Sequence, residues 1–183
     1  MRYFSNWMAC ILILLGGYSQ TGCRPAKPKL VDYSTASEAS VVLGKANRGN
    51  GLSQAISTGD GRTTTASVGG RDCQSLKLID GHEQYIYFII DPSFKSTPCS
   101  DVTVTVEYFD ATQGSFDLEY DGPTGPYSGV HKKEWQKGTR TWQRAEFKLR
   151  QTRFANSQNN LADFRLRVWT PEFFANKVTL TRD

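Results

Sequence analysis

The sequence is poor in the residues that most often perform catalysis or bind transition metals. It has two histidines and four cysteines among 183 residues. Neither His82 nor His131 has a second histidine or a cysteine at metal-ligand spacing, and the HExxH, CxxC, GxSxG and P-loop motifs are lacking. This argues against zinc-dependent hydrolysis, dithiol chemistry, the α/β-hydrolase mechanism and nucleotide hydrolysis. We expect both histidines to be solvated, His82 in a turn and His131 at the end of a strand.

A strong excess of charge of one sign is also lacking. The formal net charge is +4, and it falls by one if Arg2 is removed with a leader. Between residues 131 and 153, eight Lys or Arg stand against two Glu, with Trp135 and Trp142 among them. We interpret this span as the outward faces of two strands and their loop, because the net charge is too small for a nucleic-acid groove. No nucleic-acid partner is expected, but an acidic polysaccharide is a ligand class to test.

A long uninterrupted apolar run occurs only near the N-terminus, and it is too short to span a bilayer as a helix. This run, residues 7–15, predicts a signal peptide over residues 1–22, with a buried N-terminal helix as the alternative. Cys23 stands where a lipoprotein signal places its acylated cysteine, although Gln20 occupies a position where an aliphatic residue is usual. We expect residues 23–39 to form a lipid-anchor or tether segment. The protein would then be secreted, periplasmic or on the outer surface, touching a membrane only through that anchor.

Cysteine is rarer still after the expected acylation site, where only Cys73 and Cys99 remain. Two cysteines in an exported domain most simply form one disulfide, which here would close a loop of 26 residues. Loop-closure entropy would then contribute about 3 kcal/mol to stability. The alternative is a pair of buried free thiols.

What the sequence has in abundance is period-two alternation of apolar and polar residues. The alternating stretches are VTVTVEYF (102–109), GSFDLEYDG (114–122), TWQRAEFKL (141–149) and KVTLTR (177–182). A slip between Trp142 and Phe147 suggests a bulge, and EQYIYFIID (83–91) suggests a central strand covered on both faces. Turn sequences rich in Gly, Asp and Pro separate these stretches, and helical periodicity is lacking. Many short strands predict an all-β fold, an antiparallel β-sandwich over residues 40–183.

The same alternation predicts which polar residues face solvent. Asp117 and Glu119 fall on the polar side of their strand, so we interpret them as solvent-facing and identify no glycosidase pair. In the stretch 164–168, the alternation places Arg165 and Arg167 outward, as surface residues.

Several phrases resemble those of one known module. They are NGLSQ (50–54), GDGRTTTASVGGRDC (59–73), YIYFIIDPSF (85–94), VTVEYFD (104–110), GSFDLEYDG (114–122), GTRTWQRAEFKL (138–149) and RFANSQNNLADFRL (153–166). Together they are similar to a bacterial extracellular domain with a galactose-binding-like jelly-roll fold, and the resemblance covers residues 47–182. Such domains are often appended to, or encoded beside, carbohydrate-active enzymes. The resemblance implies carbohydrate binding rather than catalysis.

A saccharide site needs a flat aromatic ring for the apolar face of a sugar, and planar polar groups for its vicinal hydroxyls. Trp135, among polar neighbours, and Tyr127 are the expected exposed aromatics, whereas the periodicity of Trp142 favours packing. The candidate polar groups crowd one loop: Asn156, Gln158, Asn159 and Asn160. The alternative is that these amides cap their own loop.

Sandwiches of this class often hold Ca²⁺ between loop carbonyls and carboxylates. Asp60, Asp163 and Asp183 are candidate ligands by residue type alone, and Asp60 is equally compatible with a simple GDG turn. No other cofactor is expected.

These observations predict a non-catalytic, lectin-like module that binds an oligo- or polysaccharide at a loop edge or on a concave sheet face. A second hypothesis is a structural or protein-interaction module that docks a partner enzyme or receptor. A polysaccharide-active enzyme is the least favoured, because no activated nucleophile or separable acid–base pair stands out.

Overall fold

The computed structural model describes residues 30–56, 59–97 and 99–183, and Val31–Asp183 form one compact unit. The expected signal peptide, residues 1–22, and the acylation candidate Cys23 lie outside the described residues. The first strand, β1 (Glu38–Val42), begins within the segment 23–39, which we expected to form a tether. Among the described residues, no helix has the length and apolarity needed to cross a membrane.

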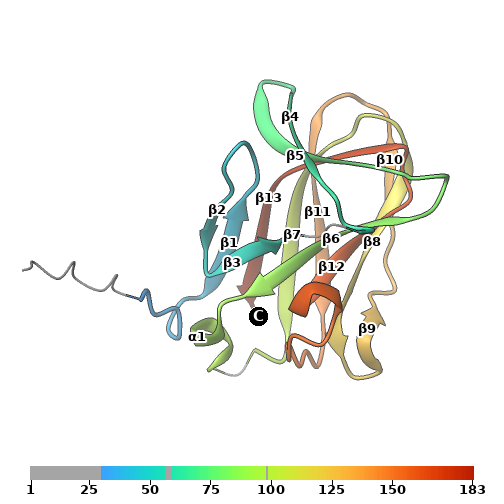
Figure 1. Cartoon of the computed structure of the whole chain (residues 1–183). Coiled ribbons are helices and arrows are strands. Elements are labelled where there is room, and N and C mark those ends of the chain that lie inside the picture. Colours follow the sequence, from blue (N-terminus) through green and yellow to red (C-terminus); the bar gives the residue numbers. More distant parts are fainter. Residues whose placement is uncertain (1–29, 57–58, 98) are drawn as a thin grey trace, which may run out of the picture. The chain divides into compact units, whose positions relative to one another are not determined.

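The described strands form two antiparallel sheets (Figure 1). Sheet A follows the order β11 (Trp142–Leu149), β7 (Val102–Phe109), β13 (Glu172–Arg182), β1 and β2 (Arg48–Asn50), with β5 (Arg71–Lys77) on β13 and β4 (Thr64–Val68) on β5. Sheet B follows the order β10 (Glu134–Lys137), β8 (Gln113–Gly122), β12 (Phe164–Val168), β6 (Gln84–Ile90) and β3 (Leu52–Ala55), with β9 (Gly125–Gly129) on β8. The helical elements of the described residues are α1 (Pro92–Lys95) and the 3-10 turn η1 (Asn159–Leu161).

Strands that follow each other in the chain mostly lie in opposite sheets from β6 onward. β6 and β8 lie in sheet B while β7 lies in sheet A, and β11, β12 and β13 alternate in the same way (Figure 1). Within sheet B, β12 pairs with β6 on one side and with β8 on the other, antiparallel to both. Two antiparallel sheets joined by repeated crossings form a jelly-roll sandwich, which confirms the predicted fold class.

The main core contains apolar side chains from both sheets. Its members include residues that the period-two alternation predicted to face inward. Val104 of β7 and Leu118 of β8 are fully buried in it. At its centre, the Phe116 ring lies 4.8 Å from that of Phe173 and 4.9 Å from that of Tyr108, measured between centroids. Because burying one such side chain contributes about 2 kcal/mol, this alternation fixes which face of each strand turns inward.

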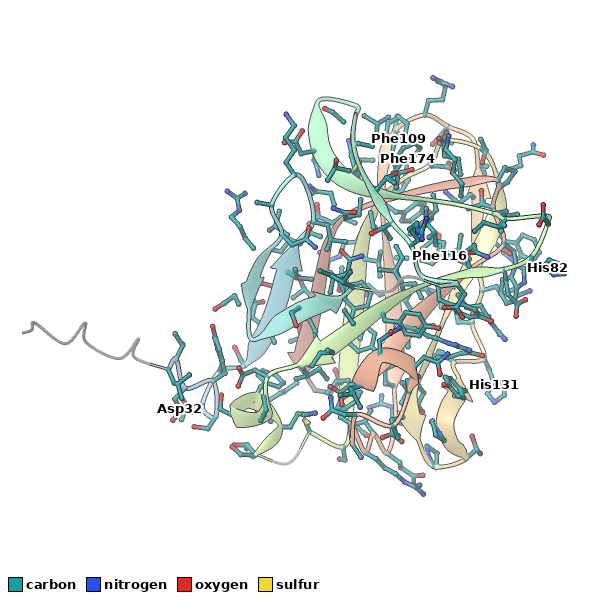
Figure 2. All side chains as sticks on the ribbon, viewed as in Figure 1. Asp32, His82, Phe109, Phe116, His131 and Phe174 are labelled. Carbon is teal, nitrogen blue, oxygen red and sulfur yellow. The ribbon has the colours of Figure 1, made fainter. Side chains whose placement is uncertain are left out.

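A second, smaller apolar cluster explains why β11 departs from simple alternation. Trp142 packs in this cluster against Phe109, with ring centroids 5.5 Å apart, whereas Phe147 faces the main core. β11 pairs continuously with β7 along its whole length, so the predicted bulge is wrong. The two side chains simply lie on opposite sides of a regular strand. Figure 2 shows Phe109 and Phe174 of the second cluster close together and apart from Phe116 of the main core.

The predicted disulfide is also wrong, because Cys73 and Cys99 are both free thiols. Cys73 lies on β5 and is buried in the second cluster, whereas Cys99 follows α1 and packs against the main core. The two side chains thus belong to different apolar clusters. Burial raises the pKa of the Cys73 thiol to about 11, which keeps it protonated and unreactive at neutral pH.

Reduction is therefore expected to leave the melting temperature unchanged. If Cys73 and Cys99 were bonded, reduction would remove about 3 kcal/mol of stability and lower the melting temperature by several degrees. The measurement is thermal unfolding with and without dithiothreitol. Alkylation of the denatured, unreduced protein followed by peptide mapping is the control, and both cysteines should be modified. A fall in melting temperature on reduction would contradict the free thiols.

Candidate functional site

The outward face of sheet B carries a regular array of polar and aromatic side chains. Every second residue of β6, β12 and β8 points away from the core, because side chains alternate along a strand. These outward residues are Tyr85 and Tyr87 on β6, Arg165 and Arg167 on β12, and Asp117 and Glu119 on β8. In the register, Arg165 lies opposite Tyr87 and Glu119. Arg167 lies opposite Tyr85 and Asp117, so each arginine has a tyrosine on one side and a carboxylate on the other.

The arginines and carboxylates of this array form ion pairs that are largely withdrawn from water. Nε of Arg165 donates to Oε2 of Glu119 at 2.7 Å, and the two residues are only 8% and 6% exposed. Arg167 forms a forked pair with Asp117, with N–O distances of 3.0 and 2.9 Å, and its Nη1 lies 2.9 Å from Oε1 of Glu119. Burial opposes the charge on Arg165, but hydrogen bonds to Glu119 and the charge of Glu119 outweigh it and raise the pKa of Arg165.

The prediction that these four charged residues face solvent is therefore wrong in one respect. The alternation placed them correctly on the outer side of sheet B. They are nonetheless covered, because Arg165 and Arg167 lie across the strands to reach the carboxylates, and aromatic rings lie over their guanidinium groups. Periodicity shows which side of a strand a residue is on, but not what lies over that side.

Aromatic rings cover the arginines and extend along the face. The guanidinium of Arg165 lies 3.7 Å from the ring centre of Tyr85 and 4.2 Å from that of Tyr127. The guanidinium of Arg167 lies 4.4 Å from the ring centre of Trp169. These stacked contacts are typical of cation–π packing. With Trp135 of β10, the rings form what we call the aromatic platform: Tyr85, Tyr127, Trp135 and Trp169.

The platform is most exposed to solvent at Trp135 and Tyr127, the two rings that were predicted from the sequence. Trp135 is 65% exposed and Tyr127 is 41% exposed. Tyr85 and Trp169 are partly exposed between them in the array, and Lys133 places its Nζ 4.1 Å from the ring centre of Trp169 and 6.0 Å from that of Trp135. A ligand lying on this face would therefore meet flat apolar rings with cationic groups between them.

One carboxylate fixes two of the rings. Glu83, just before β6, accepts a hydrogen bond from the hydroxyl of Tyr85 and another from Nε1 of Trp169, both at 2.7 Å. The hydrogen bond from Tyr85 is the largest of the effects that lower the pKa of Glu83. Burial, followed by the same hydrogen bond, raises the pKa of Tyr85, so its hydroxyl stays protonated and remains a donor. The edges of both rings are thereby fixed.

The amide-rich loop, residues 156–160, contacts Tyr127 of the platform and also forms hydrogen bonds to its own backbone. Tyr127 donates its hydroxyl hydrogen to Oδ1 of Asn159 at 3.0 Å, and buried Gln158 donates from Nε2 to the carbonyl of Glu119 at 3.2 Å. Asn156 turns away from the platform and donates to the carbonyl of Leu161 at 2.8 Å. Asn160 is exposed in a left-handed conformation, with φ of 60°. The structure thus brings Asn159 to Tyr127 and Gln158 to the carbonyl of the preceding Pro126, while Trp135 belongs to β10 at one edge of sheet B.

The three aspartates proposed as calcium ligands each have other partners. Asp163 is fully buried, and its carboxylate accepts from Lys95 Nζ at 2.9 Å and from the Ile90 amide at 2.9 Å. Asp60 accepts from the Tyr87 hydroxyl, and Asp183 accepts from Arg150. Within the described ranges, no group of three or more His, Cys, Asp or Glu is placed to hold a metal ion. The donors that surround Asp163 include an ammonium group, so its site does not fit a calcium ion.

Four residues of the face were not predicted as site residues from the sequence: Glu83, Tyr85, Lys133 and Trp169. The alternation YIY in 85–87 and RLR in 165–167 was a usable signal, since it places like side chains on one side of each strand. What it lacked was the pairing of β6 with β12, which is non-local. The prediction that His82 and His131 are solvated is confirmed, since both are exposed, and Figure 2 shows them at separate places.

No protein-family model and no curated protein match the sequence. Among solved structures, a family 29 carbohydrate-binding module from Piromyces equi aligns with a TM-score of 0.47 and 11% identity, over 79% of this chain and 91% of that one. CBM1 of BiXyn10A, in its apo form, aligns at 0.42 and 12%, over 84% and 96%. A carbohydrate-binding module specific for non-crystalline cellulose, CBM28, aligns at 0.39 and 16%, over 73% and 86%. At such scores and identities, none of these similarities bears on what this chain binds.

Proposed function

We propose that the protein is a non-catalytic carbohydrate-binding module that binds a saccharide chain across the aromatic platform. The observation that supports this most directly is the row of partly exposed rings on one sheet face, from Tyr127 past Tyr85 and Trp169 to Trp135. Sugar rings stack their apolar C–H faces on such rings. Because the arginine pairs and Glu83 already fix Tyr85 and Trp169, little conformational entropy would be lost on binding.

The environment of the carboxylates supports a binding role rather than hydrolysis. Hydrolysis of a glycosidic bond requires one carboxyl group that can donate a proton and a second that is free to act as a base or nucleophile. On this face, Asp117 is held in a fork by Arg167, and Glu119 is bonded to both arginines. Glu83 is bonded to two rings. All three carboxylates therefore serve to fix other side chains.

We further propose that the protein is exported and anchored through Cys23. Support comes from the sequence alone, in the signal-like residues 1–22 and the cysteine that follows them. Incorporation of radiolabelled palmitate into the wild-type protein, but not into Cys23→Ala, tests this. Equal labelling of the two proteins, or of neither, would contradict it.

Replacement of Trp135 by alanine is expected to weaken saccharide binding about five- to ten-fold while leaving the melting temperature unchanged. A glycan array first identifies a ligand for the purified protein, and affinity electrophoresis then compares the variants. Melting should not change, because Trp135 is 65% exposed and contributes little to the core.

The matched control is Ile56→Ala. Ile56 is 90% exposed and follows β3, at the edge of sheet B opposite to β10, so its loss should change neither binding nor stability. Unchanged binding by Trp135→Ala would exclude the platform. Capture of one specific protein, with no glycan bound, would instead favour the docking of a partner enzyme or receptor.

A further inference from the structure

A cationic cleft adjoins the aromatic platform at the loop between β9 and β10. One hollow of about 470 Å³ is lined by four basic side chains, from His131, Lys148, Arg150 and Arg167. Within the described part of the chain, no carboxylate lines it. A neighbouring hollow of about 490 Å³ shares Val130, His131 and Lys148 with the first and adds Lys132 and Glu146. We call the two hollows together the cationic cleft.

The basic groups of this region differ in whether they are already neutralised. Arg150 pairs with Asp101 at 2.9 Å and with Asp183 at 3.0 Å, and Arg167 is held by the carboxylates of sheet B. Lys148 in the cleft and Lys133 on the platform are both exposed. Among the residues that the structure describes, no carboxylate pairs with either lysine. Two cationic groups are therefore available to an incoming anion.

The cleft and the platform are continuous through Arg167 and the β9–β10 loop. Arg167 lines the cleft, and its guanidinium also lies 4.4 Å from the ring centre of Trp169. Lys133 contacts the same ring at 4.1 Å, and His131, two residues earlier, lines the cleft. A chain that lies across Trp169 would therefore meet Lys133, which lies over this ring, and Lys148 within the adjoining hollow.

From this arrangement we infer that the ligand is an acidic polysaccharide, a chain of uronic acid units. This inference rests on the proposed carbohydrate-binding function and adds the ligand class. The sugar rings lie on the platform, and their carboxylates form hydrogen-bonded ion pairs with Lys133 and Lys148, which a neutral sugar cannot form. A single-stranded nucleic acid also combines stacking with negative charge. The acidic sugar fits better because the chain's net charge is only +4, whereas nucleic-acid binding domains are usually strongly basic.

The test is affinity electrophoresis of the purified protein in gels that contain polygalacturonate, fully methyl-esterified polygalacturonate, a neutral β-glucan or single-stranded polydeoxythymidine. We expect the free acid to be bound at least five-fold more tightly than its ester, and this preference to shrink as salt rises. Lys133→Gln and Lys148→Gln should each weaken binding to the free acid about two- to five-fold, and each should weaken binding to the ester by a smaller factor.

Lys45→Gln is the matched control, because Lys45 is an exposed lysine in the β1–β2 connection and lines neither hollow of the cationic cleft. Melting temperatures of all three variants should equal that of the wild type. Equal binding of ester and free acid would overturn the inference while leaving the proposed function intact. Binding to none of the saccharides would overturn both. Tighter binding to polydeoxythymidine than to any saccharide would replace the inference with nucleic-acid binding.

Discussion

Replacing Arg165 with methionine is expected to lower the free energy of unfolding by about 3 kcal/mol. The substitution keeps an unbranched side chain between Tyr85 and Tyr127 but removes the charge that Glu119 faces at 2.7 Å. The Glu119 side chain is only 8% exposed, so water cannot take the place of the lost guanidinium. Arg167 still pairs with Glu119, which places the expected loss at the lower end of the range for broken buried pairs.

Arg144→Met is the matched control for this substitution. Arg144 pairs with Glu146 at 2.8 Å, but their side chains are 65% and 52% exposed, so the loss should stay below about 1 kcal/mol. Urea denaturation of both variants gives the two free energies, and equal m-values show that the denatured states are comparable. The double variant Arg165→Met, Glu119→Gln should lose less than the sum of its single losses, because no buried charge remains unpaired. Equal losses for Arg165→Met and Arg144→Met would contradict a buried pair.

Replacing Asp163 with asparagine is expected to lower the free energy of unfolding by about 3–5 kcal/mol. Burial raises the pKa of Asp163, but hydrogen bonds from the Ile90 amide, from Lys95 and from the Asn156 amide favour its charged form. Asparagine would turn an NH₂ group toward one of these donors and leave Lys95, which is only 14% exposed, without its counter-charge. Since these three partners belong to β6, α1 and the amide-rich loop, all three segments should loosen together.

Asp60→Asn is the matched control, because the Asp60 carboxylate accepts from the neutral Tyr87 hydroxyl at 3.1 Å and is partly exposed. We expect it to cost less than about 1 kcal/mol. Urea denaturation in excess Ca²⁺ and in EDTA separates the ion pair from the calcium hypothesis. The urea denaturation curves of the wild type in Ca²⁺ and in EDTA should coincide, because the Lys95 ammonium occupies the place that a cation would take at Asp163. A wild type stabilised by Ca²⁺, with that effect lost in Asp163→Asn, would restore the calcium hypothesis.

The buried charges link the stability of sheet B to the order of the aromatic platform. Arg165 holds Glu119 beneath the face and the rings of Tyr85 and Tyr127 above it, so one side chain orders three others. Ion pairs of this kind contribute little net stability compared with apolar packing, yet removing one partner is costly. For the proposed function, their value is a platform whose rings are oriented before a ligand binds. Trp135, which has no such support among the described contacts, is the part of the platform that a ligand can reach most freely.

The candidate site was partly predictable for reasons that can be traced to single residues. Trp135 was identified because an aromatic residue among polar neighbours has no apolar surroundings to pack into, and Tyr127 because it lies in the turn-rich stretch GPTGPYSG; both are exposed. The amides of the 156–160 loop were ambiguous in the sequence. Asn159 and Gln158 do reach the platform, but through bonds to Tyr127 and to the Glu119 backbone that join segments far apart in the chain. Local patterns cannot show such bonds.

The sequence by itself determined which residues of β7, β8, β12 and β13 turn inward, because a strand whose apolar residues alternate has only one face it can bury. That was sufficient to predict an antiparallel sandwich. Only the tertiary structure decided which strands are neighbours, since pairing between segments far apart in the chain depends on how both sheets close over one core. That pairing brings Arg165 between Tyr87 and Glu119 and separates Cys73 from Cys99, and the packing of α1 gives the Asp163 carboxylate an ion pair with Lys95. The outward residues of β12, Arg165 and Arg167, thus lie beneath the aromatic platform, because their partners come from β6 and β8.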